Sequence, residues 1–165
     1  MVKQLLIVRH AEAREPQNQQ RDTERDLTAR GYQDAVRVGN YLRVLGWQPD
    51  LMISSSATRA MASAQMIAEQ IRYPAQRIQS NNELYDASLR TFLSIINQQE
   101  DTNERIMIVG HNLTVSYLIE YLTGEEVGSV APAGFAIIEP TVQHWQEVSQ
   151  NTATLASYKA PETLS

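Results

Sequence analysis

The residues best suited to chemistry are an arginine and a histidine that follow a short apolar segment near the start of the chain. Residues 5–8 (Leu-Leu-Ile-Val) lead directly into Arg9 and His10. Such a run predicts a strand buried on both faces of a sheet, and α/β proteins bind ligands beyond the carboxyl ends of these strands. The guanidinium of Arg9 suits phosphate, and His10 can act as a base, a nucleophile or a metal ligand. Taken alone, the pair is equally compatible with ordinary surface residues in a polar loop.

A second segment repeats this arrangement. Residues 106–109 (Ile-Met-Ile-Val) are followed by Gly110 and His111, so two of the three histidines of the chain follow its two clearest buried strands. In a parallel sheet the carboxyl ends of the strands lie at one edge, and we therefore expect the two imidazoles to converge. The third histidine, His144, is expected to be exposed.

A third candidate, Arg59, follows a strand-like segment at residues 51–54 and a hydroxyl-rich loop. Its place in the first turn of a predicted helix is unfavourable for a cation because of the helix dipole, and a bound anion would relieve this. An exposed arginine on a helix face is the alternative. Two further residues could bind substrate: Arg25, in a polar loop over residues 14–26, and Asn112, beside His111 at the start of a helix, where free backbone N–H groups favour anions.

These side chains suit a phosphoryl group better than a metal ion. Cationic neighbours repel a divalent ion, and no carboxylate is spaced from the histidines as in a metal site. Arginines bind phosphate oxygens through paired hydrogen bonds, and one imidazole can attack phosphorus while the other donates to an oxygen. The attacking histidine must be neutral, and nearby cations lower its pKa. We therefore expect a phosphohistidine intermediate and neither metal nor other cofactor.

The segments that position these residues alternate between strand and helix patterns. Helices are expected after residues 28, 58, 88 and 111, and a weaker strand at residues 77–80. Residues 134–139, 145–148 and 154–158 read as strands of antiparallel hairpins. The order predicts an α/β fold of three layers (αβα), with a mostly parallel central sheet, helices on both faces and antiparallel strands at one edge.

Length and composition narrow the class of protein. The 165 residues predict a single domain over residues 1–159 and a frayed tail over residues 160–165. The net charge of −5 argues against nucleic-acid binding, and the absence of cysteine excludes disulfides and suits a cytoplasmic protein. The apolar run near the N-terminus is too short for a signal peptide, and no run approaches a membrane span. We expect a monomer.

Several motifs together resemble the histidine phosphatase superfamily, also called phosphoglycerate mutase-like. They are Arg9-His10-Ala11, Arg59 after Ser54-Ser55, and Gly110-His111. Ala11 replaces the glycine of the usual Arg-His-Gly. The short chain, residues 25–31 and Glu83-Leu84-Tyr85 resemble the small bacterial SixA-like phosphohistidine phosphatases, although Asp26 stands where that branch usually has proline. The resemblance spans about residues 3–125.

The resemblance implies a role for each matching residue. His10 would be the phosphorylated nucleophile, and Arg25 would lie near the site. Three residues would form the phosphate pocket: Arg9, Arg59 and His111. Glu83 stands at about the position where larger relatives have a general acid, but this branch lacks the helical insertion that shapes that region. A phosphohistidine substrate lessens the need for an acid, because imidazole leaves more readily than an alkoxide.

Three functions remain open at this point. The first is a metal-independent phosphatase that acts through phospho-His10 on a phosphorylated protein, such as a histidine-phosphotransfer domain. The second is a phosphomonoesterase of the same family that acts on a small phosphate ester. The third is a non-catalytic phosphate-binding module, for which the nucleophile would be unnecessary.

Overall fold

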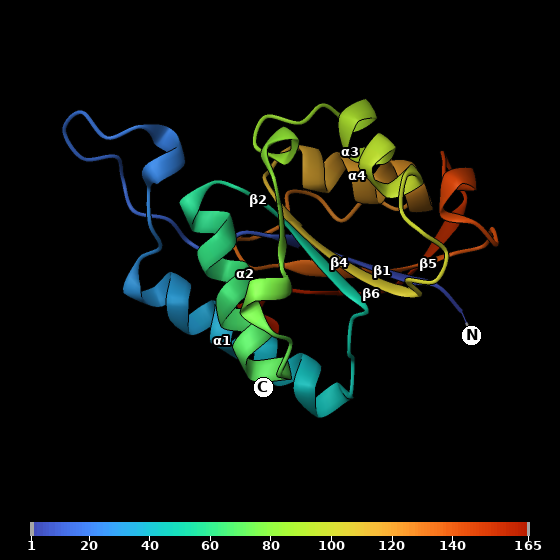
Figure 1. Cartoon of the computed structure of the whole chain (residues 1–165), viewed down its shortest axis with the longest axis horizontal. Helices are drawn as coiled ribbons and strands as arrows, with labels where there is room; N and C mark the ends of the chain where they lie inside the picture. The colour runs from blue at the N-terminus through green and yellow to red at the C-terminus, as the bar shows by residue number, and fades with distance from the viewer. Residues whose placement is uncertain (1, 165) are drawn as a thin grey trace.

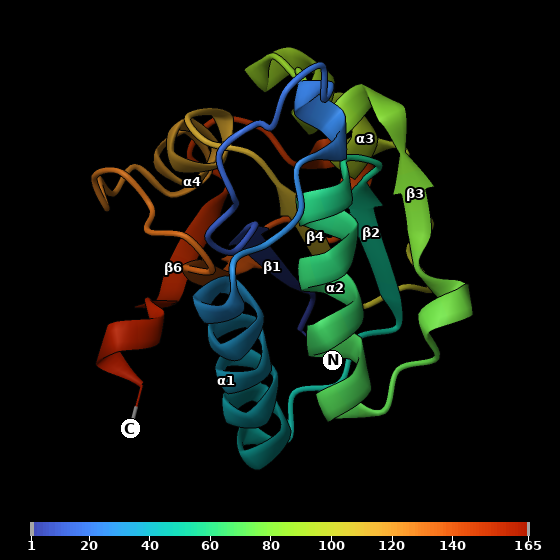
Figure 2. The same cartoon turned by 90° about the vertical axis from the view of Figure 1, so that its left-hand side faces the viewer.

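The computed structural model describes residues 2–164, which form a six-stranded sheet between two pairs of helices (Figures 1 and 2). The strands are β1 (Gln4–Arg9), β2 (Leu51–Ser55), β3 (Gln79–Asn81), β4 (Arg105–Gly110), β5 (Phe135–Pro140) and β6 (Ala153–Lys159). The helices are α1 (Ala29–Leu45), α2 (Thr58–Ile71), α3 (Leu89–Asn97) and α4 (Thr114–Thr123).

The strand order is β3-β2-β4-β1-β5-β6. The first four strands are parallel, whereas β5 is antiparallel to β1 and β6 is antiparallel to β5. This arrangement confirms the predicted fold class, including the antiparallel edge. Because β2, β4 and β1 are neighbours, the segments that follow them leave the sheet at the same edge.

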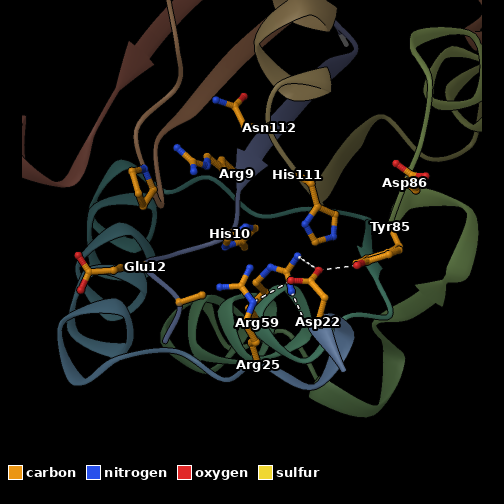
Figure 3. Close-up of a pocket in the computed structure, with 12 residues that line it drawn as sticks. Arg9, His10, Glu12, Asp22, Arg25, Arg59, Tyr85, Asp86, His111 and Asn112 are labelled. Carbon is orange, nitrogen blue, oxygen red and sulfur yellow. Dashed lines mark hydrogen bonds and ion pairs between the residues drawn. The ribbon is translucent and has the colours of Figure 1, made fainter. Parts of the chain in front are cut away.

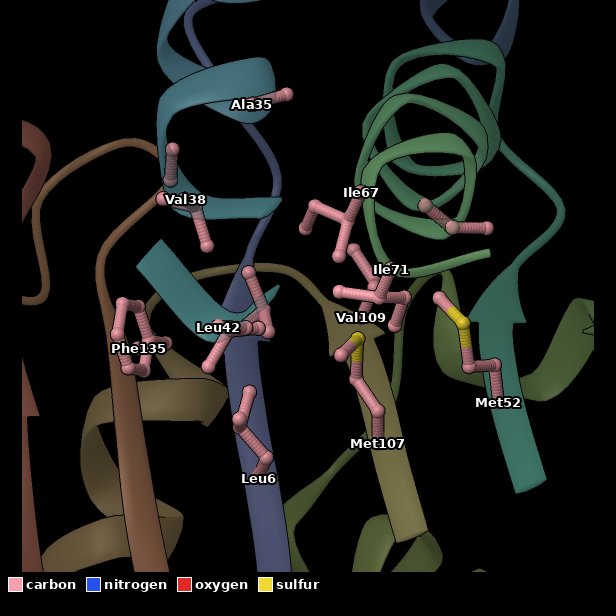
Figure 4. Packing of buried hydrophobic residues seen from close by; sticks show 14 of the residues in the cluster. Leu6, Ala35, Val38, Leu42, Met52, Ile67, Ile71, Met107, Val109 and Phe135 are labelled. Atoms are coloured by element: carbon pink, nitrogen blue, oxygen red, sulfur yellow. The ribbon is translucent and has the colours of Figure 1, made fainter. Parts of the chain in front are cut away.

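Alternating side chains of the central strands fill two separate cores. Leu6 and Met107 lie directly opposite each other on β1 and β4 and pack against α1 and α2 (Figure 4). Their neighbours Leu5 and Ile106 face the other way, toward α3 and α4. Since both faces are covered, these strands are apolar throughout rather than alternating with polar residues.

The helices begin and end where their capping residues predict. The Thr28 hydroxyl accepts a hydrogen bond from the Gly31 amide at the start of α1, and the Ser88 hydroxyl accepts one from the Thr91 amide at the start of α3. Gly46 ends α1 in the left-handed conformation that glycine adopts without strain (φ 76°).

The strand predicted at residues 145–148 is wrong, because residues Trp145–Glu147 form a short 3-10 helix, η4. The apolar residues Trp145 and Val148 are both buried, but they belong to this turn rather than to a pleated strand. The Trp145 ring is fully buried, its Nε1–H donates to the Asn103 carbonyl (2.7 Å), and its amide donates to Asp101 Oδ1 (3.0 Å).

The prediction of a frayed tail is also wrong for residues 160–164. Pro161–Thr163 form a 3-10 helix, η5, and Leu164 packs against the core beneath α1. The Pro161 carbonyl accepts a hydrogen bond from Arg37 Nη1 (3.3 Å) on that helix. Residue 165 lies outside the described residues. Within residues 2–164, no helix combines the length and apolarity that crossing a bilayer requires.

The close contact between the start of α1 and the segment after β1 predicts the effect of one substitution. A Cβ at position 31 would overlap the Glu12 carbonyl oxygen, which also accepts the Thr28 amide (3.0 Å). We expect Gly31→Ala to lower the free energy of unfolding by about 1–3 kcal/mol, as overpacked sites do. Urea denaturation checks this, with exposed Arg30→Ala as the control; equal stability of the two variants would contradict the prediction.

Candidate active site

The two histidines predicted to converge do so at the edge of the sheet (Figure 3). Strands β1 and β4 are adjacent and parallel, with Arg9 opposite Gly110. His10 and His111 are the residues that directly follow these two strands. Their ring centroids lie 5.2 Å apart, and the rings are tilted by 57°. This distance allows both imidazoles to contact one tetrahedral oxyanion.

Cationic side chains surround the two rings. Arg59 projects from the first turn of α2 and is only 6% exposed, and Arg9 comes from the end of β1. Together with Arg25 they line a cavity of about 610 Å³ that also contains both histidines. The structure therefore brings together five predicted site residues from three strand ends and one loop.

The hydrogen bond at His10 determines which ring nitrogen carries its proton. Nδ1 lies 2.7 Å from the Ala11 carbonyl oxygen, which can only accept, so Nδ1 carries the proton and Nε2 keeps its lone pair. Burial lowers the pKa of His10 to about 3, although the bond to Ala11 opposes this, and the charges of His111 and Arg59 lower it further. The His10 ring is therefore neutral at neutral pH, with a free lone pair on Nε2.

His111 is held by the residue that ends β2. Its Nε2 lies 2.8 Å from Ser55 Oγ, which also accepts the Ala57 amide, so the serine hydrogen is available to His111. That donation would leave the proton of a neutral His111 ring on Nδ1. Burial and the nearby Arg59 lower the pKa of His111 to about 4. Both rings are thus neutral at neutral pH.

The guanidinium groups of Arg9 and Arg59 each keep one donor without a partner among residues 2–164. Arg9 Nη1 donates to the Val130 carbonyl (2.8 Å), and Arg59 Nη1 donates to the Asp22 carbonyl (2.7 Å). The Nε atoms of Arg9 and Arg59 are buried and have no partner among the described residues. An unsatisfied buried donor is costly, and an oxyanion is the kind of ligand that satisfies it.

Asp22 is a pocket residue that the sequence did not indicate. It begins a single 3-10 turn, η1 (Asp22–Glu24), in the loop over residues 14–26, where no periodic pattern marks it. Its carboxylate accepts from Arg59 Nη2 (3.0 Å), from Arg25 Nε (2.9 Å) and from the Tyr85 hydroxyl. The hydrogen bond from Tyr85, followed by those from the arginines, holds the pKa of Asp22 well below its usual range.

Tyr85 is the second residue that the sequence analysis did not assign to the site. It follows the short turn η3 (Asn82–Leu84), and its ring meets His111 edge-on at a centroid distance of 5.5 Å. The Arg59 guanidinium lies 5.8 Å from the centroid of the same ring. Three carboxylates also line the cavity: Glu12, Asp22 and Asp86.

Two predicted site residues are placed differently from the expectation. Asn112 lines the cavity, but its amide is bonded within the protein, because Nδ2 donates to Ser129 Oγ (2.9 Å) and Oδ1 accepts from Ser116 Oγ (2.5 Å). Helix α4 begins two residues later, at Thr114. Glu83 is exposed and does not line the cavity, so the expected acid is not brought to the two histidines. Across residues 2–164, no three His, Asp or Glu side chains are grouped so that they could hold a metal ion.

Comparison with known proteins adds independent information. The family model described as histidine phosphatase superfamily (branch 1) matches residues 5–92. An uncharacterized protein of Mycobacterium tuberculosis is 28% identical over 163 residues, which cover 93% of this chain and 99% of that protein.

Solved structures are similar over almost the whole chain. A protein of Agrobacterium tumefaciens, provisionally named a phosphohistidine phosphatase SixA, has a TM-score of 0.80 and 25% identity and covers 98% of this chain and 99% of its own. A protein histidine phosphatase SixA complexed with tungstate has a TM-score of 0.83 over 98% of this chain and 99% of its own, at 18% identity, which shows a shared fold.

The lowered pKa values of the two histidines predict a pH dependence of stability. In the unfolded chain both rings bind protons near pH 6.5, whereas folded His10 and His111 do so near pH 3 and pH 4. Between about pH 6.5 and pH 4 the unfolded state therefore binds more protons, and the free energy of unfolding falls as the pH falls.

Each histidine contributes at most about 1.4 kcal/mol per pH unit to this slope. We expect His10→Gln and His111→Gln each to flatten the curve measured by urea denaturation in phosphate-free buffer. The His144→Gln variant shows what loss of an exposed histidine does by itself. A His10→Gln protein with the wild-type slope would show that the ring is not buried in its neutral form.

Proposed function

The chain belongs to the histidine phosphatase superfamily, and on this basis we propose that it is a metal-independent phosphatase that forms a phosphohistidine on His10. We propose further that its substrate is a phosphohistidine in another protein. One observation supports the chemistry above all: two neutral imidazoles, one buried and one half-buried, lie 5.2 Å apart in a pocket that also contains Arg9 and Arg59.

In the first step His10 Nε2 attacks the phosphorus atom of the substrate. The Nε2–P bond forms as the bond from phosphorus to the leaving nitrogen breaks. The leaving ring carries a proton on its other nitrogen, keeps the electron pair of the broken bond and departs as neutral imidazole. Positive charge develops on the His10 ring, where the Nδ1–H bond to the Ala11 carbonyl stabilises it. The guanidinium groups and His111 bind the phosphoryl oxygens, whose charge they disperse.

In the second step water attacks phospho-His10. The new P–O bond forms as the Nε2–P bond breaks, the electron pair returns to Nε2, and inorganic phosphate leaves with the proton that the water loses. The lowered pKa of His10 favours its neutral ring. The neutral ring is the nucleophile of the first step and the leaving group of the second. Neither step requires a metal ion or another cofactor.

Glu83 and Asp22, two carboxylates that could serve as a general acid, are unsuited to that role. An alkoxide leaving group needs a proton from a general acid, but Glu83 lies outside the cavity and the pKa of Asp22 lies well below its usual range. Asp22 therefore remains ionised and cannot donate. A leaving imidazole needs less help, which supports phosphohistidine as the substrate.

A small-molecule phosphomonoesterase is the second candidate. Glu12 and Asp86 line the cavity, and either could protonate the oxygen of a small ester bound there. A binding module without catalysis is disfavoured by the arrangement of His10, because binding alone does not need a nitrogen lone pair kept free at neutral pH. We also propose that the protein acts in the cytoplasm as a monomer and binds no nucleic acid.

Covalent labelling tests the proposed intermediate. Incubation with radiolabelled phosphoramidate, followed by rapid denaturation, should give a label on His10 that is stable to alkali and lost in acid. Turnover should persist in EDTA. His10→Gln should carry no label, whereas His111→Gln should react more slowly yet still label, because it retains the nucleophile. A protein that binds phosphate but never becomes labelled would be a binding module.

The position of Glu83 yields a separate prediction about the substrate. Because this carboxylate is exposed and outside the cavity, we expect Glu83→Gln to keep kcat/KM for free phosphohistidine within about twofold of the wild type. The wild-type protein should also hydrolyse phosphohistidine faster than a simple alkyl phosphate. Equal, large losses on both substrates in Glu83→Gln would mean that this carboxylate takes part in the reaction after all.

A further inference from the structure

A second hollow lies beside the phosphate pocket, between α4 and the loop over residues 126–129. Its volume is about 420 Å³. Leu113 and Tyr117, 54% and 57% exposed, stand four residues apart and so present their side chains on one face of the helical turn. Val127 and Gly128 form the facing wall. This groove is one of few places where large apolar side chains remain in contact with water.

The groove adjoins the phosphate pocket across a short polar wall. Asn112 lines the pocket (Figure 3), and its Nδ2 donates to Oγ of Ser129. Ser129 in turn lines the groove. Ser116 reinforces this shared wall, since its Oγ bonds Asn112 Oδ1 and accepts the Val130 amide (2.9 Å). Asn112, the residue after His111, therefore stands between the two hollows. A ligand that fills both hollows must be larger than a phosphoryl group and its leaving imidazole.

The groove also differs from the pocket in charge. Between Arg105 and Lys159 the chain has no lysine or arginine but contains five acidic residues: Glu120, Glu125, Glu126, Glu139 and Glu147. Glu120 and Glu126 are exposed and line the groove. An apolar hollow with an acidic rim is complementary to an apolar side chain flanked by lysine or arginine, and it repels anionic surfaces.

We propose that this groove docks the protein substrate by taking one apolar side chain, flanked by basic residues, from the surface around its phosphohistidine. The inference rests on the proposed function and adds the surface by which a macromolecular substrate is selected. Small phosphorylated compounds occupy the pocket alone, so the groove contributes to KM for the phosphoprotein and leaves reactions of small substrates unchanged.

Alanine substitutions in the groove test this directly. The double variant Leu113→Ala/Tyr117→Ala removes two exposed side chains, and we expect KM for a phosphorylated histidine-phosphotransfer domain to rise about tenfold, the effect of losing about 1.4 kcal/mol of binding energy. The kcat for the phosphorylated domain and the kcat/KM for p-nitrophenyl phosphate should both stay at the wild-type values. The charge-reversed variant Glu120→Lys/Glu126→Lys should raise the same KM, and more so at low salt.

A matched control comes from the opposite face of the sheet. Val44 and Leu45 are 80% and 54% exposed at the end of α1, so Val44→Ala/Leu45→Ala removes similar apolar surface far from the groove. We expect this control to leave both activities unchanged. Retention of the wild-type KM for the phosphoprotein in the groove variant would overturn the docking proposal, as would a change of oligomeric state measured by sedimentation, which would assign the groove to self-association.

The two proposals fail in different ways. If the wild-type protein is not labelled on His10 and turns over neither substrate, the proposed function is wrong. If it turns over both substrates and the groove variant does so with unchanged constants, only the docking surface is wrong.

Discussion

The in-register pairing of β1 with β4 is the constraint on which the rest of the site depends. Arg9 lies opposite Gly110, so the next residue on each strand is a histidine. The register is held by side chains far from the chemistry, because Leu6 and Met107 meet in one core and Leu5 and Ile106 in the other. A shift of one residue would exchange the side chains that face the two cores, so the packing of these side chains also determines the distance between the imidazoles.

The same sheet edge explains the electrostatics of the pocket. Desolvation is the largest cause of the lowered pKa at both histidines, and the arginine charges add to it. The Nε donors of Arg9 and Arg59 are buried and have no partner within residues 2–164. The pocket thus combines two neutral rings with two unpaired cationic donors, a combination that an oxyanion stabilises more than any neutral ligand does.

Much of this arrangement could be predicted from the sequence because it follows local patterns. Apolar runs ending in Arg9-His10 and Gly110-His111 predict both the parallel strands and the converging rings. Asp22 and Tyr85 could not be found in this way, because they reach the pocket from an aperiodic loop and a short turn, where no spacing rule indicates direction.

The errors have equally local causes. Trp145 and Val148 gave residues 145–148 the appearance of a strand, although both are buried anchors of a short turn. Glu83 stands at a position in the sequence that suggested an acid, but the turn at Asn82–Leu84 leaves it exposed. The direction of a side chain after a strand depends on such turns, which tertiary contacts determine.

The ion pair between Asp22 and Arg59 links the loop over residues 14–26 to the first turn of α2. The Asp22 carboxylate contacts Arg59 of α2, Tyr85 and Arg25 at the same time, and an oxyanion in the pocket would compete with it for Arg59. Anion binding and the attachment of Asp22 are therefore thermodynamically coupled. By reciprocity, a partner that binds the loop at Asp22 would alter how tightly the pocket retains an anion.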